Sequence, residues 1–484
     1  MNQNNISAAE LFLRVRELLI LPELEPKTRN KMMHDTLILC CHEGVKETKQ
    51  AFGNLFSQVD YLCKAHGIKV ADKIAIQTMR RHSNSQEPLS SEDLKYDARA
   101  LAIFISAVFG VDVPHELNVL IPHTNRPYQK GLEINNHRIR CIVKNWDSDF
   151  IRVDIDQDAD EEEYLVQLKD EENHIDHTYL WDILKEGMQL NLLDCQVKQP
   201  VITPRLIVVE PDYLVDISSI ATCFTAFGHH PLLYLLNQMK PRANTQATLL
   251  GNFAGAALDD IINTNGKYQM NETIKTNFRE KALEFCTCPW FDAKKFYTDA
   301  SLQAFNLQQV VDILFPRTAS QAQMSAFRGE SLYDRKKAIL EPSFVCEALG
   351  IQGRVDLMTT DCKLLVEQKS GRNMNIETHQ VDPGYHSYQL EPHYVQLLLY
   401  YGVLQHNFKL SNDRVNIRLL YSKYQPQDGL MVVAYYHKLF QEAITYRNQL
   451  VAASFEIAKE GFEHALNEFT PDVLNVAGTQ DFFY

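Results

Sequence analysis

The stretch LGIQGRVDLMTTDCKLLVEQKSG, from Leu349 to Gly371, places three charged residues in segments that are otherwise apolar. Asp356 lies in one expected strand, and Glu367 and Lys369 close the next. Side chains alternate along a strand with a period of two, so Glu367 and Lys369 point to the same face. If the two strands pair, the spacing predicts that all three side chains converge on one point.

Such a group of charges has a specific chemistry. Two carboxylates that meet repel each other unless a cation lies between them, and oxygen ligands suit a hard ion such as Mg²⁺ or Mn²⁺. A metal ion there would activate water and neutralise charge on a phosphate, while an ammonium would orient the nucleophile or stabilise the transition state. The pattern favours phosphodiester hydrolysis. The alternative is an edge strand on which an Asp and a Glu-x-Lys form a surface salt bridge.

Composition bounds these interpretations. The 484 residues are too many for one ordinary core, which predicts two or three domains. The net charge of -14 repels phosphate, so contact with nucleic acid requires a local basic groove. The cysteines are scattered, the start MNQNNISAAE is not a secretory signal, and no apolar run is long enough to cross a bilayer. We therefore expect a cytoplasmic protein that has no membrane span.

The pattern along the chain predicts an α/β fold class with three domains. Residues 1–115 carry apolar residues at helical spacing, typical of a helical bundle that begins with a Ser7–Glu10 capping box. Residues 116–204 contain short β-prone runs, which favour a small OB-like β-barrel. Residues 205–484 mix strands, beginning with RLIVVE, and helices, which indicates an α/β core that ends in a long helix. The acidic run at residues 154–173 is interpreted as a solvated loop or face.

A family resemblance adds to this interpretation. The motif GRVDL, followed by EQKSG, resembles the core of the PD-(D/E)xK nuclease superfamily, and QLLLY matches the Gln-x-x-x-Tyr signature of its RecB-type branch. The resemblance implies a mixed-sheet nuclease core that uses Mg²⁺ or Mn²⁺. It implies that Asp356, Glu367 and the backbone carbonyl of Gln368 hold the ion and that Lys369 assists the attacking water.

The same resemblance implies where DNA is contacted. Gln396 and Tyr400 lie one helical turn apart on one face, where a DNA strand would be reached. Arg354 and Arg372 flank the motif and are candidates for phosphate contacts, although each is equally consistent with a solvated surface arginine.

The upstream segments extend the resemblance over residues 117–460. The small-residue helix LLGNFAGAALDDII and the preceding RLIVVEPDYLVDISSI resemble the nuclease half of replication and repair nuclease-helicases that trim single-stranded flaps. This implies a nuclease for single-stranded or flap DNA, with a helicase domain or partner beyond residue 484. One alternative is a nuclease-fold module that binds single-stranded DNA or a partner domain without cutting. Another is a stand-alone defence or adaptation nuclease.

The sequence departs from the family at the small-residue helix. The family pattern is Gly-x-x-x-His, in which the histidine is a metal ligand, but GNFAG places Gly255 there. Asp259, one turn further on, is a candidate replacement ligand, either directly or through water. The preferred interpretation is that Gly251, Gly255 and their alanine neighbours allow close helix packing.

Many relatives also carry an iron–sulfur cluster held by one cysteine before the core and three after it. Cys223 stands at the first place, but no cysteine follows Cys362, so no such cluster is expected. Three histidines, His379, His386 and His393, surround an expected loop over the site and are interpreted as surface or substrate-contacting side chains.

Overall fold

The computed structural model divides the chain into two compact units, which are described separately. The N-terminal unit comprises Met1–Asp212 and Ser454–Ala465, and the C-terminal unit comprises Tyr213–Ala453 and Leu466–Tyr484. The described residues are 6–21, 23–48, 52, 54–85, 88–126, 137–155, 163–171, 173–225, 228–239, 244–264, 266–381, 388–410, 414–461, 463–464 and 467. His386 lies outside them, as do residues 156–162 and 172 of the acidic run. The loop interpretation of that run is wrong for residues 164–167 and 169–170, which form strands.

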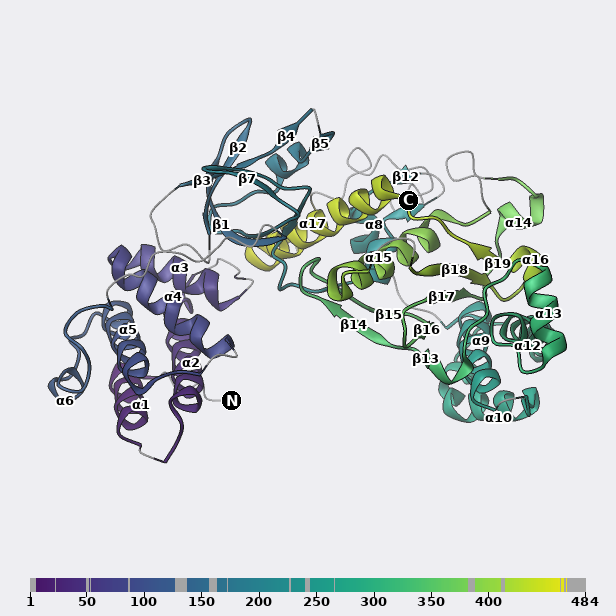
Figure 1. Cartoon of the computed structure of the whole chain (residues 1–484), viewed down its shortest axis with the longest axis horizontal. Helices are drawn as coiled ribbons and strands as arrows, with labels where there is room; N and C mark the ends of the chain where they lie inside the picture. The colour runs from purple at the N-terminus through teal and green to yellow at the C-terminus, as the bar shows by residue number, and fades with distance from the viewer. Residues whose placement is uncertain are drawn as a thin grey trace. The chain divides into compact units, whose positions relative to one another are not determined.

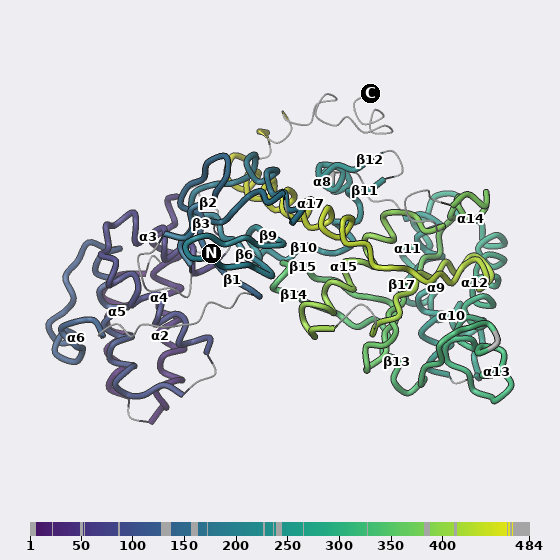
Figure 2. Tube along the Cα trace, turned by 45° about the horizontal axis from the view of Figure 1, so that its top comes forward, coloured from purple at the N-terminus to yellow at the C-terminus, as the bar shows by residue number. Residues whose placement is uncertain are grey.

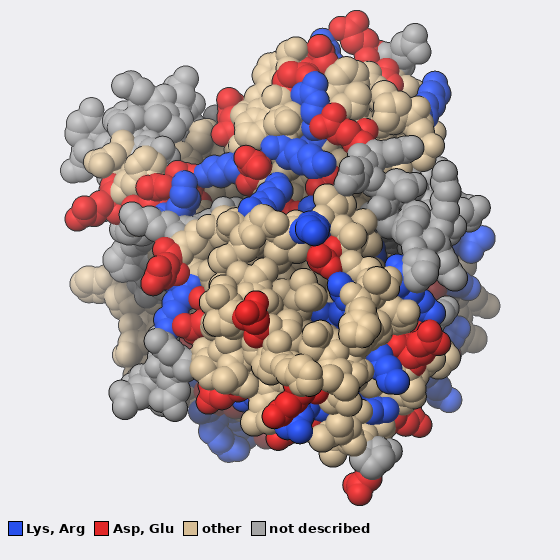
Figure 3. Space-filling model, turned by 90° about the vertical axis from the view of Figure 1, so that its left-hand side faces the viewer, with Lys and Arg blue, Asp and Glu red and all other residues tan. Residues whose placement is uncertain are grey.

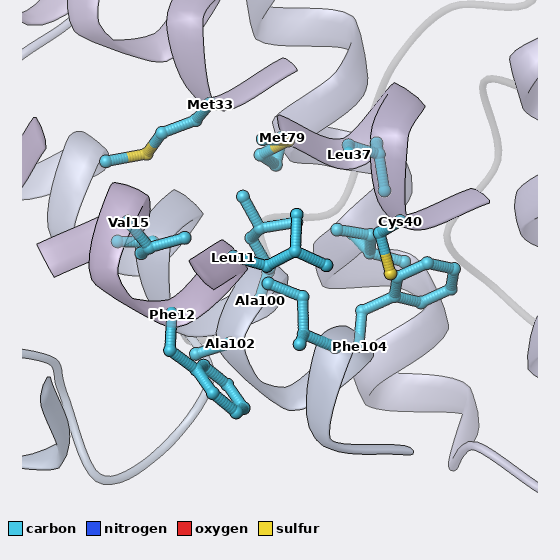
Figure 4. Packing of buried hydrophobic residues seen from close by; sticks show 14 of the residues in the cluster. Leu11, Phe12, Val15, Met33, Leu37, Cys40, Met79, Ala100, Ala102 and Phe104 are labelled. Atoms are coloured by element: carbon cyan, nitrogen blue, oxygen red, sulfur yellow. The ribbon is translucent and has the colours of Figure 1, made fainter. Parts of the chain in front are cut away.

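The N-terminal unit begins with helices around one apolar core. Ser7 caps the first helix, because its Oγ accepts the Glu10 N–H at 3.3 Å and Glu10 accepts the Ser7 N–H at 2.8 Å, which confirms the predicted capping box. Leu11, Leu37 and Phe104, from three different helices, meet in the core (Figure 4). The helices are α1 (Ala8–Ile20), α2 (Pro26–Gly44), α3 (Leu55–Ala65), α4 (Val70–Asn84), α5 (Ser91–Phe109) and α6 (His115–Asn118).

A seven-stranded sheet, in the order β7-β8-β3-β2-β1-β6-β9, forms the rest of this unit. Its neighbouring strands are antiparallel except for the parallel pair β3 and β8. The strands are β1 (Arg138–Trp146), β2 (Phe150–Ile155), β3 (Tyr164–Gln167), β6 (Gln189–Leu193), β7 (Gln196–Lys198), β8 (Val201–Thr203) and β9 (Leu206–Val209). The two-residue strands β4 (Lys169–Asp170) and β5 (Ile175–Asp176) pair with each other, and the 3-10 helix η1 (Thr178–Asp182) follows.

One strand of this sheet differs from the sequence-based assignment. The RLIVVE segment was expected to open the third domain, but β9 pairs with β6 and so belongs to the N-terminal unit. An apolar run of this kind predicts a buried strand and does not specify which sheet it joins.

The C-terminal unit contains two main sheets. A five-stranded sheet has the order β13-β16-β17-β18-β19, in which β17 and β18 are parallel and the other pairs antiparallel. A three-stranded sheet has the order β10-β15-β14. The strands are β10 (Val215–Asp216), β11 (Phe224–Thr225), β12 (Gly228–His229), β13 (Ala338–Leu340), β14 (Ser343–Cys346), β15 (Ile351–Arg354), β16 (Leu357–Thr359), β17 (Leu364–Lys369), β18 (Asn416–Tyr421) and β19 (Leu430–Val432).

Helices cover both faces of the five-stranded sheet, with β17 between α15 on one side and α9 and α12 on the other (Figures 1 and 2). Leu364 and Val366 pack on the α9–α12 side. The helical elements are α7 (Ile217–Ala221), α8 (Leu232–Met239), α9 (Gln246–Asn263), α10 (Met270–Glu280), α11 (Ala282–Cys286), α12 (Ala293–Leu314), α13 (Ala319–Phe327), η2 (Arg335–Lys337), α14 (Met374–Thr378), α15 (Glu391–Phe408), α16 (Pro426–Gly429) and α17 (His437–Glu460). The predicted mixed α/β class is confirmed.

The apolar helices and the surface charges bear on the environment of the protein. Within the described part of the chain, no helix is both long and apolar enough to span a membrane. On the face shown in Figure 3, Lys and Arg side chains are interleaved with Asp and Glu, and a wide area carries few charges. Within the N-terminal unit, Lys73 contacts both Asp60 and Asp154.

Candidate functional site at the end of β17

The alternation of β17 sorts its last residues between the two faces of the sheet. Glu367 and Lys369 lie on the α15 side, where Lys369 Nζ donates to Glu367 Oε1 and to Gln396 Oε1, each at 2.8 Å. Gln368 points to the α12 side, where its Nε2 donates to Ser422 Oγ at 2.7 Å. The predicted shared face of Glu367 and Lys369 is therefore confirmed.

Asp356 reaches the same place from the neighbouring segment. It was expected on a strand, which is wrong: β15 ends at Arg354 and β16 begins at Leu357, so Asp356 lies where the chain passes from one sheet to the other. Leu357 is the register partner of Val366, and continuing that register places Asp356 opposite Glu367. Asp356 Oδ2 accepts the Gln368 N–H at 2.5 Å, which fixes the carboxylate beside β17.

The two carboxylates are electrostatically coupled. Burial, followed by the charge of Asp356, raises the pKa of Glu367 to about 8, although Lys369 opposes the shift. Burial also raises the pKa of Asp356, against the Gln368 hydrogen bond and the Lys369 charge. Glu367 is 2% exposed, and its buried Oε2 has no hydrogen-bond partner among the described residues. An orphaned carboxylate oxygen beside a second carboxylate is a donor set that fits a hard divalent cation.

Two further acidic residues lie nearby. Burial raises the pKa of Asp259 to about 7, and the charges of Glu341 and Asp356 add to the shift. The Glu341 N–H donates to Asp356 O at 3.0 Å, and its carboxylate lies 3.0 Å from Arg354 Nη1. Asp259 is therefore close enough to Asp356 for their charges to interact, and its role as a metal ligand stays a prediction. Across the described residues, no three His, Cys, Asp or Glu side chains are grouped so that they could hold a metal ion by themselves.

Glu341 was missed by the sequence analysis. It directly follows β13, whose Leu340 pairs with Leu357 of β16, so Glu341 lies next to Asp356 across the sheet. Its φ of 49° is in the left-handed region, which is uncommon for a residue with a side chain. The only signal in the sequence is a strand followed by Glu-Pro, and this signal is weak because the pairing of β13 with β16 is not readable from it.

The two glycines of α9 have different surroundings. A Cβ on Gly251 would lie 3.2 Å from Ser370 Oγ, so close packing is confirmed at that position. A Cβ on Gly255 would meet no described atom within 4 Å, so the packing interpretation is wrong for Gly255. The helix therefore has open space where the family pattern places a histidine.

The residues of the Gln-x-x-x-Tyr signature bond to protein groups. Gln396 accepts from Lys369, as described above, and Tyr400 is buried, with its hydroxyl donating to Arg354 O at 2.6 Å. Gly353 lets Tyr400 approach the β15 backbone, because a Cβ there would lie 2.9 Å from the tyrosine ring. The expected contact of Gln396 and Tyr400 with DNA stays a prediction.

The flanking arginines and one histidine are also placed. Arg354 and Arg372 have side chains that are 60% and 64% exposed, and both pair with a glutamate, so solvent reaches them while a neighbouring carboxylate holds them. His393 is half-buried, and its Nδ1 is 3.0 Å from the Tyr421 hydroxyl. Burial, with a smaller contribution from Lys369, lowers the pKa of His393 to about 3, so this ring is neutral at physiological pH.

Comparison with known proteins gives no match, either to a protein-family model or to a curated protein.

Proposed function

We propose that the C-terminal unit is a metal-dependent nuclease module of the PD-(D/E)xK type. The observation that carries the proposal is the buried Glu367 Oε2 beside Asp356 and Lys369, which no described residue hydrogen-bonds. The order of these residues along the chain also supports the proposal. Asp356 directly precedes β16, Glu367 lies on its antiparallel partner β17, and Lys369 follows two residues after Glu367. A surface salt bridge does not account for the pattern, because Glu367 is buried.

Each residue has a role in this proposal. Asp356, Glu367 and the Gln368 carbonyl would hold Mg²⁺ or Mn²⁺, and Asp259 would support the ion directly or through water. When bound, the ion supplies a Lewis acid that stabilises negative charge on a phosphate. Lys369 would donate to the attacking water or to a phosphate oxygen.

Gln396 and Tyr400 are best explained as positioning residues in this site. Gln396 holds the Lys369 ammonium, and Tyr400 holds the β15 end through Arg354 O. Replacing Gln396 with Leu is expected to lower the cleavage rate about 10-fold, because Lys369 then loses one of its two acceptors. Gln396→Glu should recover much of the rate, since a carboxylate also accepts from Lys369. If Gln396→Leu alters only strand affinity, the DNA-contact role is correct instead.

The substrate assignment extends the proposal. We infer that the module acts on single-stranded or flap DNA in replication or repair, as part of a nuclease-helicase, with the sheet of the N-terminal unit as an OB-like strand-binding element. This assignment depends on the motif resemblance, and a stand-alone defence nuclease would use the same site.

The test is cleavage of labelled single-stranded and duplex DNA in Mg²⁺ or Mn²⁺. Glu367→Gln and Lys369→Met are expected to reduce cleavage by on the order of 10²–10³-fold, as losses of charge-stabilising groups do. Asp361→Asn is the matched control, because Asp361 is an acid in the turn before β17 that pairs with Lys337. Equal cleavage by all four proteins would contradict the proposal.

A second candidate is a nuclease-fold module that binds a strand without cutting it. The open space at Gly255 favours this candidate, because the helix supplies no ligand there. It predicts that the wild type binds single-stranded DNA and cuts nothing in either metal. A Gly255→His variant that gains cleavage would show that the site lacks only this ligand.

A further inference from the structure

Two cationic side chains follow the strand ends of the five-stranded sheet, on the same side as Lys369. Arg372 follows the end of β17, and Lys423 follows the end of β18, its parallel neighbour. Lys369 and Tyr421 are register partners at these ends, and the Ser422 N–H donates to Lys369 O at 2.9 Å. The two segments that carry the cations are therefore held side by side.

Both cations converge on one carboxylate, that of Glu377 in α14. Arg372 Nε donates to one of its oxygens, and Lys423 Nζ lies 3.3 Å from the other. The Tyr424 hydroxyl lies 2.9 Å from that second oxygen. These donors, of which Arg372 contributes most, lower the pKa of Glu377. The Glu377 side chain is therefore a negatively charged carboxylate at neutral pH.

The donors are arranged by the protein rather than by chance surface contact. The Asn373 N–H donates to the Tyr424 hydroxyl at 2.7 Å, and Asn373 is itself fully buried, with Nδ2 donating to Tyr388 O at 2.8 Å. The Tyr424 hydroxyl is thereby directed toward Glu377. Meanwhile the side chains of Arg372 and Lys423 remain 64% and 39% exposed, so an anion from solvent reaches both cations.

A phosphate from solvent can compete with Glu377 for these donors, because the two cations are partly exposed and solvent screens their ion pairs. A phosphate offers more acceptor oxygens than a carboxylate, and a guanidinium binds phosphate in a bidentate manner. With a net charge of -14 on the whole chain, a local surplus of cations is the feature that a nucleic-acid strand requires.

We propose that Arg372, Lys423 and Tyr424 form a phosphate-binding subsite for a nucleic-acid strand, which the Glu377 carboxylate occupies when no strand is bound. The inference rests on the proposed function for its substrate class. The Cα atoms of Arg372 and Lys369 are at most about 10 Å apart, because three residues of extended chain span no more. A strand held at this subsite therefore runs past Lys369.

The test measures binding of a fluorescent oligothymidylate by anisotropy, without divalent ions, over a range of salt concentrations. Glu377→Gln is expected to bind about 3–10-fold more tightly than the wild type, because the competing anion is gone. Lys423→Gln and Arg372→Gln are expected to bind more weakly. Each should also reduce the slope of log affinity against log salt by about 0.7, the value for one lost contact to a single strand.

Asp361→Asn and Lys337→Gln are the matched controls, because these residues form an exposed ion pair, with 3.0 Å between Nζ and Oδ2, beside the other end of β17. They change the net charge by the same amounts, and they are expected to bind as the wild type does. Equal binding by Glu377→Gln and Asp361→Asn would overturn the subsite, even if the wild type cuts DNA. So would a complete lack of oligonucleotide binding in every protein.

The proposed function fails separately. If the wild type cuts nothing in Mg²⁺ or Mn²⁺, yet Glu377→Gln binds the strand more tightly than Asp361→Asn, then catalysis is excluded and the subsite stands.

Discussion

Asp97 in the helical part of the N-terminal unit and Glu367 in the C-terminal unit are both buried carboxylates, 3% and 2% exposed. Asp97 has partners at both oxygens: His82 Nδ1 lies 2.9 Å from each, and Asn30 Nδ2 donates to Oδ2 at 2.9 Å. Glu367 has Lys369 at one oxygen, and the part of the chain that the structure describes offers no partner to the other. Burying a charge without full pairing is costly, so the first arrangement is explained by stability and the second by binding.

The largest expected difference between the two carboxylates is in stability. Asp97→Ala should lower the free energy of unfolding of the N-terminal unit by about 3 kcal/mol, because His82 and Asn30 lose a buried acceptor. Glu367→Gln should leave the free energy of unfolding of the C-terminal unit unchanged or higher, because an uncharged amide of the same shape replaces a buried group that is costly to ionise. Denaturant-dependent hydrogen exchange reports on the two units separately. Similar losses in the free energy of unfolding for Asp97→Ala and Glu367→Gln would contradict the different roles assigned to the two carboxylates.

A half-buried histidine provides an intermediate case. His229 of β12 lies between two carboxylates, with Nε2 2.6 Å from Glu391 Oε2 and Nδ1 2.7 Å from Glu442 Oε1. The Glu391 hydrogen bond, followed by that of Glu442, raises the pKa of His229 to about 9. This imidazolium is fully paired, as Asp97 is, so it should stabilise the fold.

The sign of the pH dependence follows from that shift. The folded-state pKa of about 9 lies above the unfolded value of about 6.5, so the stabilisation is fully present below pH 6.5 and is lost as the pH rises toward and through 9. We expect the C-terminal unit to lose about 1–2 kcal/mol over this range, less than the shift alone implies because solvent screens the pairs. Thermal unfolding of the wild type and His229→Gln checks this. An equally steep decline in the variant would show that other groups are responsible.

The sequence located the core of the site and not its surroundings. The spacing of Asp356, Glu367 and Lys369 predicted their convergence because one antiparallel pair, β16 and β17, brings them together, and a period of two fixes the faces. Glu341 was not predicted, because its position depends on the pairing of β13 with β16. Lys423 was not predicted either, because the parallel pairing of β17 and β18 joins segments that are distant in the sequence.

The same limit applies to Gly255. A helical face of small residues is consistent with close packing and also with an open surface, and only the neighbours distinguish them. The structure shows a close neighbour at Gly251 and none within the described residues at Gly255.

The smallest expected effect uses these two glycines. Gly255→Ala should raise the free energy of unfolding by about 0.5–1 kcal/mol, because Ala is the better helix former and the new methyl group meets no described atom. Gly251→Ala should raise the free energy of unfolding by less, because its methyl group approaches Ser370 Oγ at 3.2 Å. Urea denaturation of both variants makes the comparison. A larger gain for Gly251→Ala would contradict the assigned surroundings.

We propose that Glu367 Oε2, which lacks a partner among the described residues, and the facing Asp356 hold a divalent cation. Calorimetric titration of the protein with Mn²⁺ tests it most directly, with Glu367→Gln, Asp356→Asn and the control Asp361→Asn measured alongside. We expect the wild type to bind Mn²⁺ at this site. The control should keep the site, and both Glu367→Gln and Asp356→Asn should lose it. Binding that is the same in all four proteins, or absent from the wild type, would contradict it.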